Sequence, residues 1–205
     1  MSPVRGRGPD AALMQHATST GSRPASNGMR LLYLADIRLP TEKAHGLQIM
    51  KTCEALARAG HEVELVVPRR RNDIAQDPFD YYRCEKNFTI TTLFTIDLPL
   101  GRFGYMIERF VFATMAALYV GTHPSDVIYS REAFIFALMS VPGKRIVWES
   151  HTGEWDMAAR TTARAAHRVV VLTHAARAWY AERGVDNTKI VVAPDGIDLA
   201  QFAHP

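Results

Sequence analysis

The chain has 205 residues, of which 47% are hydrophobic and 22% are charged. This balance is typical of a soluble globular protein and excludes a disordered chain or a bundle of membrane-spanning helices. The formal net charge of +3 comes entirely from residues 1–30, because the remaining residues hold 20 basic and 20 acidic side chains. A neutral remainder implies no basic domain face for nucleic acid.

Residues 1–28 are predicted to form a disordered tail, because they are rich in Gly, Pro, Ser, Ala and Arg and show no hydrophobic periodicity. We find in them no apolar segment of the kind that a secretory signal contains. The two cysteines, Cys53 and Cys84, have neither the spacing of metal ligands nor the number that a disulfide framework needs. These features favour a protein of the reducing cytoplasm.

The first folded stretch has the pattern of a strand, a loop, a helix and a second strand. The apolar runs Leu31–Ala35 and Val63–Val67 are predicted to be parallel strands, joined by a polar loop over Asp36–His45 and a helix over Gly46–Ala59. Gly60 is predicted to end this helix, because glycine adopts positive φ at little cost. Ligands of open α/β sheets bind at the carboxyl ends of the strands, so the loop is expected to lie at the functional edge.

The most hydrophobic predicted helix runs from Phe103 to Gly121, after a strand over Phe88–Phe94 and a turn over Leu98–Gly101. We expect this helix to be buried in the domain, because its uncharged part is shorter than the ~20 residues that cross a bilayer. The alternative is a peripheral contact with a membrane surface. That alternative is less favoured, because an interfacial helix normally has a basic face and only Arg102 and Arg109 qualify here.

The rest of the chain alternates strands with helices. The predicted strands are Val127–Ser130, Arg145–Glu149, Val169–Leu172 and Lys189–Ala193; the predicted helices are Glu132–Met139, Asp156–His167 and a segment capped by Thr173 and ended by Gly184. This alternation predicts an α/β domain with a doubly wound, mostly parallel sheet of about six or seven strands and helices on both faces.

Three signatures that are common in this fold class are missing from the sequence. No GxGxxG follows the first strand, which argues against a nicotinamide or flavin dinucleotide site. No GxxxxGK[ST] is present, which excludes a P-loop nucleotidase. No GxSxG is present either, which excludes the α/β-hydrolase interpretation.

Three segments resemble the N-terminal half of retaining glycosyltransferases of the GT-B fold, in particular glycosyltransferase family 4. They are LPTEKAHGLQIMKTCEALARAGHEVELVVP, then DVIYSREAF with VWESHTGEW, and last HRVVVLTHAARAWYAERGVDNTKIVVAPDGIDLAQF. Together they cover most of residues 29–202 in the order and spacing of the family. The resemblance implies that residues 29–205 form the Rossmann-like N-terminal domain of such an enzyme.

The resemblance further implies a transfer of sugar from a nucleotide sugar to an acceptor, with retention of configuration and without a cofactor or metal ion. In such enzymes the first domain holds the acceptor and the second domain binds the nucleotide sugar. We expect that second, C-terminal domain to be missing from the chain, and the fragment alone to be inactive. The alternative is a non-catalytic remnant, or a module with the same fold that binds carbohydrate or another small molecule.

Two site residues are implied by position in the family motifs. His151 matches the histidine near the transferred sugar, where a neutral imidazole can donate to one hydroxyl and accept from another. Gly46 matches the glycine at which the backbone approaches the donor phosphates, and a helix N-terminus favours an anion there. The alternatives are a structural histidine at a strand end and a glycine that merely begins the helix.

Four further candidates for substrate binding follow predicted strands. Ser130 and Arg131 come at the end of one strand, and Arg131 is suited to a bidentate contact with an anionic acceptor. The alternative for Arg131 is a surface ion pair with a neighbouring acidic residue, Glu132 or Asp126. Glu149 is expected either to orient the His151 imidazole or to form a salt bridge, and Gly153 belongs to the loop that follows.

Overall fold

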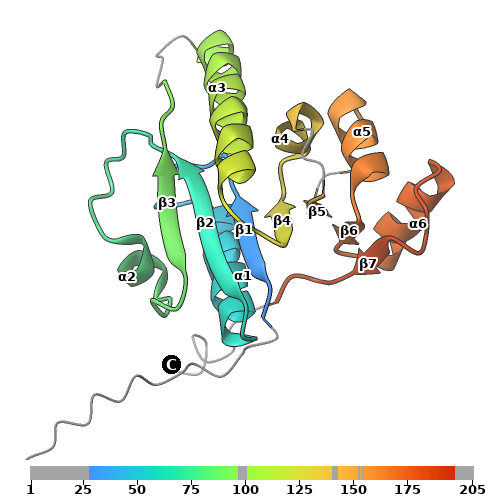
Figure 1. Ribbon diagram of the computed structural model, residues 1–205, viewed down its shortest axis with the longest axis horizontal. Helices are drawn as coiled ribbons and strands as arrows, with labels where there is room; N and C mark the ends of the chain where they lie inside the picture. The colour runs from blue at the N-terminus through green and yellow to red at the C-terminus, as the bar shows by residue number, and fades with distance from the viewer. Residues whose placement is uncertain (1–27, 97–100, 140–142, 152, 154, 197–205) are drawn as a thin grey trace, which may run out of the picture.

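The computed structural model describes residues 28–96, 101–139, 143–151, 153 and 155–196. Within these residues, seven strands form one parallel sheet in the order β3-β2-β1-β4-β5-β6-β7 (Figure 1). The strands are β1 (Arg30–Leu34), β2 (Glu62–Pro68), β3 (Thr89–Leu93), β4 (Val127–Ser130), β5 (Arg145–Ser150), β6 (Arg168–Val171) and β7 (Ile190–Val192). The prediction of a doubly wound, parallel α/β sheet is confirmed.

Six helices connect these strands in the part of the chain that the structure describes. They are α1 (Ala44–Arg58), α2 (Pro78–Tyr82), α3 (Gly101–Thr122), α4 (Ala133–Leu138), α5 (Met157–Ala165) and α6 (His174–Glu182). The first helix begins at Ala44, two residues before the predicted start. The predicted tail lies outside the described residues apart from Gly28, and so does most of the predicted turn before α3.

Side-chain caps and a glycine explain where three of the helices begin or end. The carboxylate of Asp156 accepts from the amide of Ala159, and the hydroxyl of Thr173 accepts from the amide of Ala176, so α5 and α6 both begin with a side-chain cap. Gly60 follows α1 with φ of 94°, a conformation that costs other residues more than glycine. The sequence predicted both the Thr173 cap and the Gly60 stop.

Helices cover both faces of the sheet. One apolar core lies between the sheet and helices α1 and α2, and includes Leu31, Tyr33, Met50, Cys53, Val63 and Tyr82. The other core lies between the sheet and helices α3 to α6, and includes Leu34, Phe112, Ile128, Ile135, Ala163, Val169 and Tyr180. The division follows from the connections, since right-handed crossovers place helices on opposite faces when the chain reverses its direction of travel across the sheet.

The direction in which the chain adds new strands to the sheet reverses between β1 and β4. Moving outward from β1, the chain builds β2 and β3 on one side, then crosses back to β4 and continues on the other side. At such a switch point the loops that follow neighbouring strands turn to opposite faces and leave a crevice. The carboxyl ends of β1 and β4 are therefore where a ligand site is expected.

Candidate active site

A pocket of about 850 Å³ lies at the carboxyl ends of the central strands. Its walls come from the segments that follow β1, β4 and β5, and from helices α1, α3 and α5. The charged and titratable side chains around it include Asp36, His45, Arg70, Arg109, Arg131 and His151. The pocket thus occupies the switch point, and it is large enough for a small-molecule substrate.

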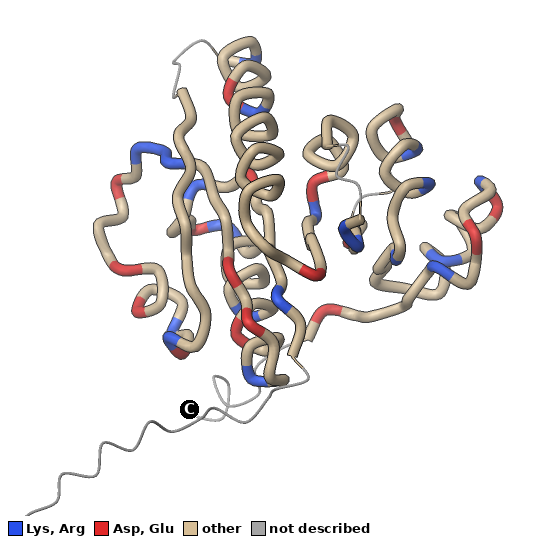
Figure 2. Tube along the Cα trace, in the orientation of Figure 1, with Lys and Arg blue, Asp and Glu red and all other residues tan. Residues whose placement is uncertain are grey.

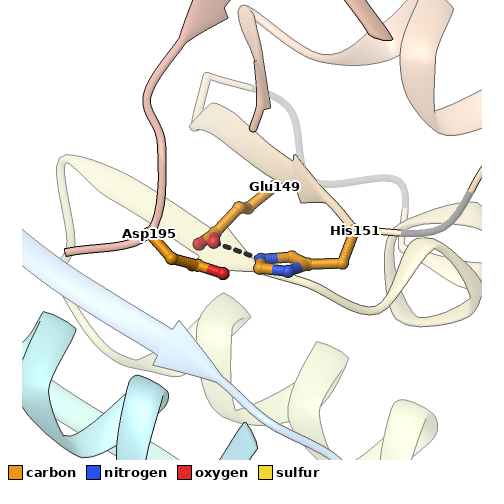
Figure 3. Close-up of side chains that lie close together, drawn as sticks. All are labelled: Glu149, His151 and Asp195. Atoms are coloured by element: carbon orange, nitrogen blue, oxygen red, sulfur yellow. Dashed lines mark hydrogen bonds and ion pairs between the residues drawn. The ribbon is translucent and has the colours of Figure 1, made fainter. Parts of the chain in front are cut away.

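Arg131 and His151 line one wall of the pocket and belong to a network centred on Glu149, near the end of β5. Its carboxylate accepts hydrogen bonds from the Tyr129 hydroxyl at 2.6 Å, from the Arg131 guanidinium at 2.8 Å and from Nε2 of His151. Figure 3 shows the imidazole of His151 lying against this carboxylate. Both contacts that the sequence analysis considered for Glu149, with the His151 imidazole and in a salt bridge, are present, while its predicted contact with a substrate stays a prediction.

The network holds Glu149 in its ionised form. Burial alone raises the pKa of this carboxyl, but the hydrogen bonds from His151, Arg131 and Tyr129 lower it to about 2. An ionised carboxylate only accepts hydrogen bonds, so Nε2 of His151 carries the proton that it donates. In the neutral imidazole Nδ1 is then an acceptor, and a ligand hydroxyl is the kind of group that it can bind.

Arg131 follows strand β4 and is held by hydrogen bonds to one residue of β5 and one residue of α1. One guanidinium nitrogen donates to Glu149 and another donates to Oε1 of Gln48 at 2.9 Å. The side chain is only 11% exposed, and its nearest acidic groups are Glu149 and Asp195. The alternative interpretation, a surface ion pair with Glu132 or Asp126, is wrong, because the guanidinium pairs with Glu149 and lies near Asp195 instead.

Asp195, in the segment after β7, joins the same network from the far end of the sequence. Its carboxylate accepts from Nε2 of Gln48 at 3.0 Å and lies 3.7 Å from the Arg131 guanidinium. Glu149, His151 and Asp195 could each offer one atom to a metal ion, since these atoms lie within 4.8 Å of one another. Arg131 already supplies a positive charge to both carboxylates, so the group fits a hydrogen-bond network better than a cation site.

The opposite wall is a second group of arginines and carboxylates. Arg70 lies 2.8 Å from Asp36 and 3.6 Å from Glu108, while Arg109 lies 3.5 Å from Asp36 and 3.3 Å from Glu132. Burial raises the pKa of Asp36, and the two arginines only partly oppose this shift. Burial also raises the pKa of Glu132, against the effect of Arg109.

Gly46 is explained by packing. A Cβ atom at this position would lie 2.3 Å from the Tyr82 hydroxyl and 2.5 Å from Cγ2 of Thr41. The Tyr82 hydroxyl is fixed there because it accepts from the amide of Thr41 and donates to the carbonyl of Thr41. The Gly46 amide donates to the carbonyl of Lys43 at 3.1 Å. Gly46 therefore lies behind the pocket wall, and the predicted phosphate contact gains no support from this position.

Ser130 is also a structural residue. Its side chain is completely buried, and its hydroxyl donates to the carbonyl of Leu34 at 2.7 Å and accepts from the amide of Glu132 at 2.9 Å. These bonds tie the end of β4 to β1 and shape the turn that carries Arg131. Ser130 is buried and is not among the residues that line the pocket, so its predicted contact with a substrate gains no support and stays a prediction.

Gly153 is exposed, and a Cβ atom there would meet no described atom within 4 Å. It does not line the pocket, so its predicted contact with substrate stays a prediction. Several residues that do line the pocket were not singled out from the sequence, namely Asp36, Gln48, Tyr105 and Glu132. Their polar type and their place after a strand or on a helix end were visible signals, but their neighbours in space were not.

Comparison with known proteins identifies the family. Residues 46–201 match the family model described as Glycosyltransferase Family 4. No curated protein sequence matches the chain. The match spans well over half of the chain and includes all of the Arg131, Glu149, His151 and Asp195 network.

Solved structures with the same fold include enzymes of two kinds. HepE from Anabaena, in complex with UDP and glucose, has a TM-score of 0.55 at 13% identity, over 84% of this chain and 46% of that chain. A glycosyltransferase from Rickettsia africae has a TM-score of 0.51 at 13% identity, over 86% and 45%. UDP-GlcNAc 2-epimerase from Neisseria meningitidis has a TM-score of 0.58 at 10% identity, over 82% and 47%.

At these identities the likeness shows the fold alone. The chain spans a little less than half the length of each of these structures, which is the share of one domain. Because the similar structures include both glycosyltransferases and an epimerase, the family is assigned from the match to the family model and not from the fold. The chain belongs to glycosyltransferase family 4 and has the fold of the N-terminal domain of a GT-B enzyme.

Proposed function

We propose that this chain is the acceptor-side half of a retaining glycosyltransferase that uses a nucleotide sugar. Membership of glycosyltransferase family 4 supports transfer of a sugar, and one structure of the same fold contains UDP and glucose. In this proposal the nucleotide sugar is bound by a second domain, and the 205 residues supply the acceptor side. The proposed setting is the cytoplasm, with peripheral contact at the inner face of the membrane, and the proposed reaction needs no metal ion or cofactor.

The observation that carries the proposal is the network of Arg131, Glu149 and His151 at the switch-point pocket. Glu149 fixes the imidazole so that Nδ1 is the acceptor, and a sugar hydroxyl is a suitable donor to it. Arg131 keeps its guanidinium beside the same carboxylate, where it adds positive charge to the pocket. In the proposed mechanism these residues bind and orient the sugar, and the departing phosphate takes the proton of the acceptor.

The test is a screen for donor and acceptor. The chain alone, and the chain joined to a family 4 donor domain, are incubated with a panel of UDP-, GDP- and ADP-sugars and candidate acceptors, and nucleotide release and product are measured. We expect transfer with retention only from the two-domain protein. Transfer by the 205 residues alone would contradict the assignment of the donor site to a second domain.

A second candidate function is a binding module with the same fold and no catalysis. Calorimetric titration of the chain with sugars and nucleotide sugars separates the two. A module binds its ligand tightly without a second domain, whereas an acceptor half is expected to bind a nucleotide sugar weakly or not at all.

A further inference from the structure

Four buried side-chain atoms lack a hydrogen-bond partner in the part of the chain that the structure describes. They are the Tyr33 hydroxyl and Nε of Arg70, Arg109 and Arg131; Nε of Arg109 has only a long ion pair, 3.5 Å from Asp36. All four residues line the same pocket. Buried polar groups are normally paired, because an unpaired one costs stability. Their gathering at one pocket indicates a site whose hydrogen bonds a ligand completes.

Tyr33 differs from the other three, because its unpaired atom is a neutral hydroxyl. The residue lies in β1, is completely buried and stacks on Tyr129 of β4, with the ring centres 4.9 Å apart. The Tyr129 hydroxyl donates to Glu149, whereas the Tyr33 hydroxyl has no partner among the described residues. Of the two stacked tyrosines, Tyr33 is the one that lines the pocket, so its hydroxyl is the one available to a ligand.

The Arg131 guanidinium supplies a second donor near Tyr33. Arg131 comes two residues after Tyr129, which is paired with Tyr33 across β1 and β4. Its terminal nitrogens donate to Gln48 and Glu149, but Nε has no hydrogen-bond partner. Burial raises the pKa of the Tyr33 hydroxyl well above its usual value, so this group stays protonated and can donate. An oxygen atom of a ligand is the group that can accept from both donors.

The charges around Arg131 favour a neutral oxygen over an anion. Two carboxylates, Glu149 at 2.8 Å and Asp195 at 3.7 Å, already lie beside this one guanidinium. The arginines of the opposite wall are paired with carboxylates as well. Figure 2 shows the same mixture directly after β4, where a basic residue precedes an acidic one. A further anion would be repelled by the two carboxylates, whereas a hydroxyl accepts both hydrogen bonds without adding charge.

We propose that the Tyr33 hydroxyl and Nε of Arg131 form a subsite for one hydroxyl group of a neutral sugar. Tyr33 is then a specificity-determining residue, because a ligand that lacks this hydroxyl leaves both buried donors unpaired. The assignment of that sugar to the acceptor rests on the proposed function. The subsite itself requires only that the pocket binds a sugar.

The test is binding of free sugars to the 205-residue chain, measured by ligand-observed NMR titration. The probes are glucose, galactose, mannose and N-acetylglucosamine, with glucuronate as the anionic comparison. We expect at least one neutral sugar to bind the wild type more tightly than glucuronate does, and Tyr33→Phe to weaken that binding about tenfold. Among the single deoxy derivatives of this sugar, one is expected to bind the wild type weakly and to bind Tyr33→Phe no more weakly than the parent sugar does.

Stability without a ligand separates a ligand-binding hydroxyl from a structural one. Tyr33→Phe removes an unpaired buried hydroxyl, so its midpoint in urea denaturation is expected to equal or exceed that of the wild type. The matched control is Tyr119→Phe on α3, whose hydroxyl donates to Glu64 at 2.6 Å and does not line the pocket. This control is expected to have a lower midpoint and to bind the sugars like the wild type.

Four results would overturn the proposal. A lower midpoint for Tyr33→Phe would show that the hydroxyl already has an internal partner, such as a bound water. Equal sugar affinity in Tyr33→Phe and the wild type would remove the role of this hydroxyl, and so would tighter binding of glucuronate or no binding of any neutral sugar. Sugar transfer has no part in these measurements, so the subsite and the proposed function can fail separately.

Discussion

The two walls of the pocket both pair arginines with buried carboxylates, yet the carboxyl pKa values move in opposite directions. The Glu149 side chain is 7% exposed and the Asp36 side chain 3% exposed, so burial disfavours the charge of each. The pKa of Glu149 falls to about 2, whereas the pKa of Asp36 rises. Burial alone therefore does not explain why the two pKa values move in opposite directions.

The number of short hydrogen bonds to the carboxylate explains the difference. Glu149 accepts from Tyr129, Arg131 and His151. Asp36 accepts from Arg70 at 2.8 Å, and Arg109 is further away at 3.5 Å. One wall therefore holds a carboxyl whose pKa is lowered by its hydrogen bonds, while the other wall holds carboxyls whose pKa is raised by burial.

The largest effect is expected from Glu149→Ala, on stability. This change leaves the buried Arg131 guanidinium with only Gln48 and the more distant Asp195, and breaking a buried ion pair costs about 3 kcal/mol of unfolding free energy or more. Asp36→Ala is expected to cost less, because Arg70 keeps Glu108 and Arg109 keeps Glu132. Urea denaturation measures both; an equal loss in the two variants would refute the difference between the walls.

The control for this pair is Glu42→Ala. Glu42 forms an ion pair with Arg38 at 2.9 Å, but its side chain is 61% exposed. Solvent screens such a pair, so no measurable change in the denaturation midpoint is expected.

The next effect is on activity and concerns His151→Ala in the two-domain protein. The imidazole is 23% exposed and faces the pocket, so its loss is expected to leave the melting temperature nearly unchanged. Turnover is expected to fall about tenfold to a hundredfold, the range for losing a hydrogen bond to a reacting ligand. His174→Ala, an exposed residue at the start of α6, is the control. A large drop in melting temperature with normal turnover would make His151 a structural residue.

The elements of the fold could be predicted because their signals are local. Apolar runs, caps and glycine stops are read within about ten residues, and they placed all seven strands correctly. Arg131, Glu149 and His151 were predicted to lie near one site, since each follows the carboxyl end of a parallel strand. Many polar residues follow the strands, and the resemblance to the family motif selected these three among them.

The partners within the site could not be predicted, because they depend on sheet order and side-chain direction. Asp195 bonds Gln48 across 147 positions of sequence. Arg70 lies between Arg69 and Arg71, a pattern that is typical of a solvated loop. In the structure Arg70 is paired with the buried carboxylate of Asp36. Gly46 was assigned to phosphate binding because it matches the family glycine. The contact that requires glycine in this structure comes from Tyr82, which is distant in sequence and could not be predicted.

A smaller effect is expected in the pH dependence of stability. The pKa of Glu149 is 4.5 when unfolded and about 2 when folded, so its stabilisation is present above pH 4.5 and is lost as the pH falls. Between about pH 6 and pH 3 the difference in unfolding free energy between the wild type and Glu149→Gln should shrink by about 2 kcal/mol. Urea denaturation at several pH values measures this. A constant difference would mean that Glu149 is not held ionised.

The smallest effect is expected from Asp36→Asn, and its sign is what sharpens the comparison. Since the folded pKa of Asp36 is raised, its contribution is present below the unfolded value of 3.8 and is lost as the pH rises through the folded value. The amide removes a charge whose burial is unfavourable, so the cost near neutral pH should stay below about 1 kcal/mol, although Arg70 exchanges a carboxylate for an amide oxygen. On acidification Asp36→Asn should lose stability more steeply than the wild type, because the wild type regains the Asp36 contribution and the variant does not. The opposite slopes of Asp36→Asn and Glu149→Gln, measured by urea denaturation on the same pH series, would separate the wall whose carboxyl pKa is lowered from the wall whose carboxyl pKa is raised; parallel slopes would contradict that division.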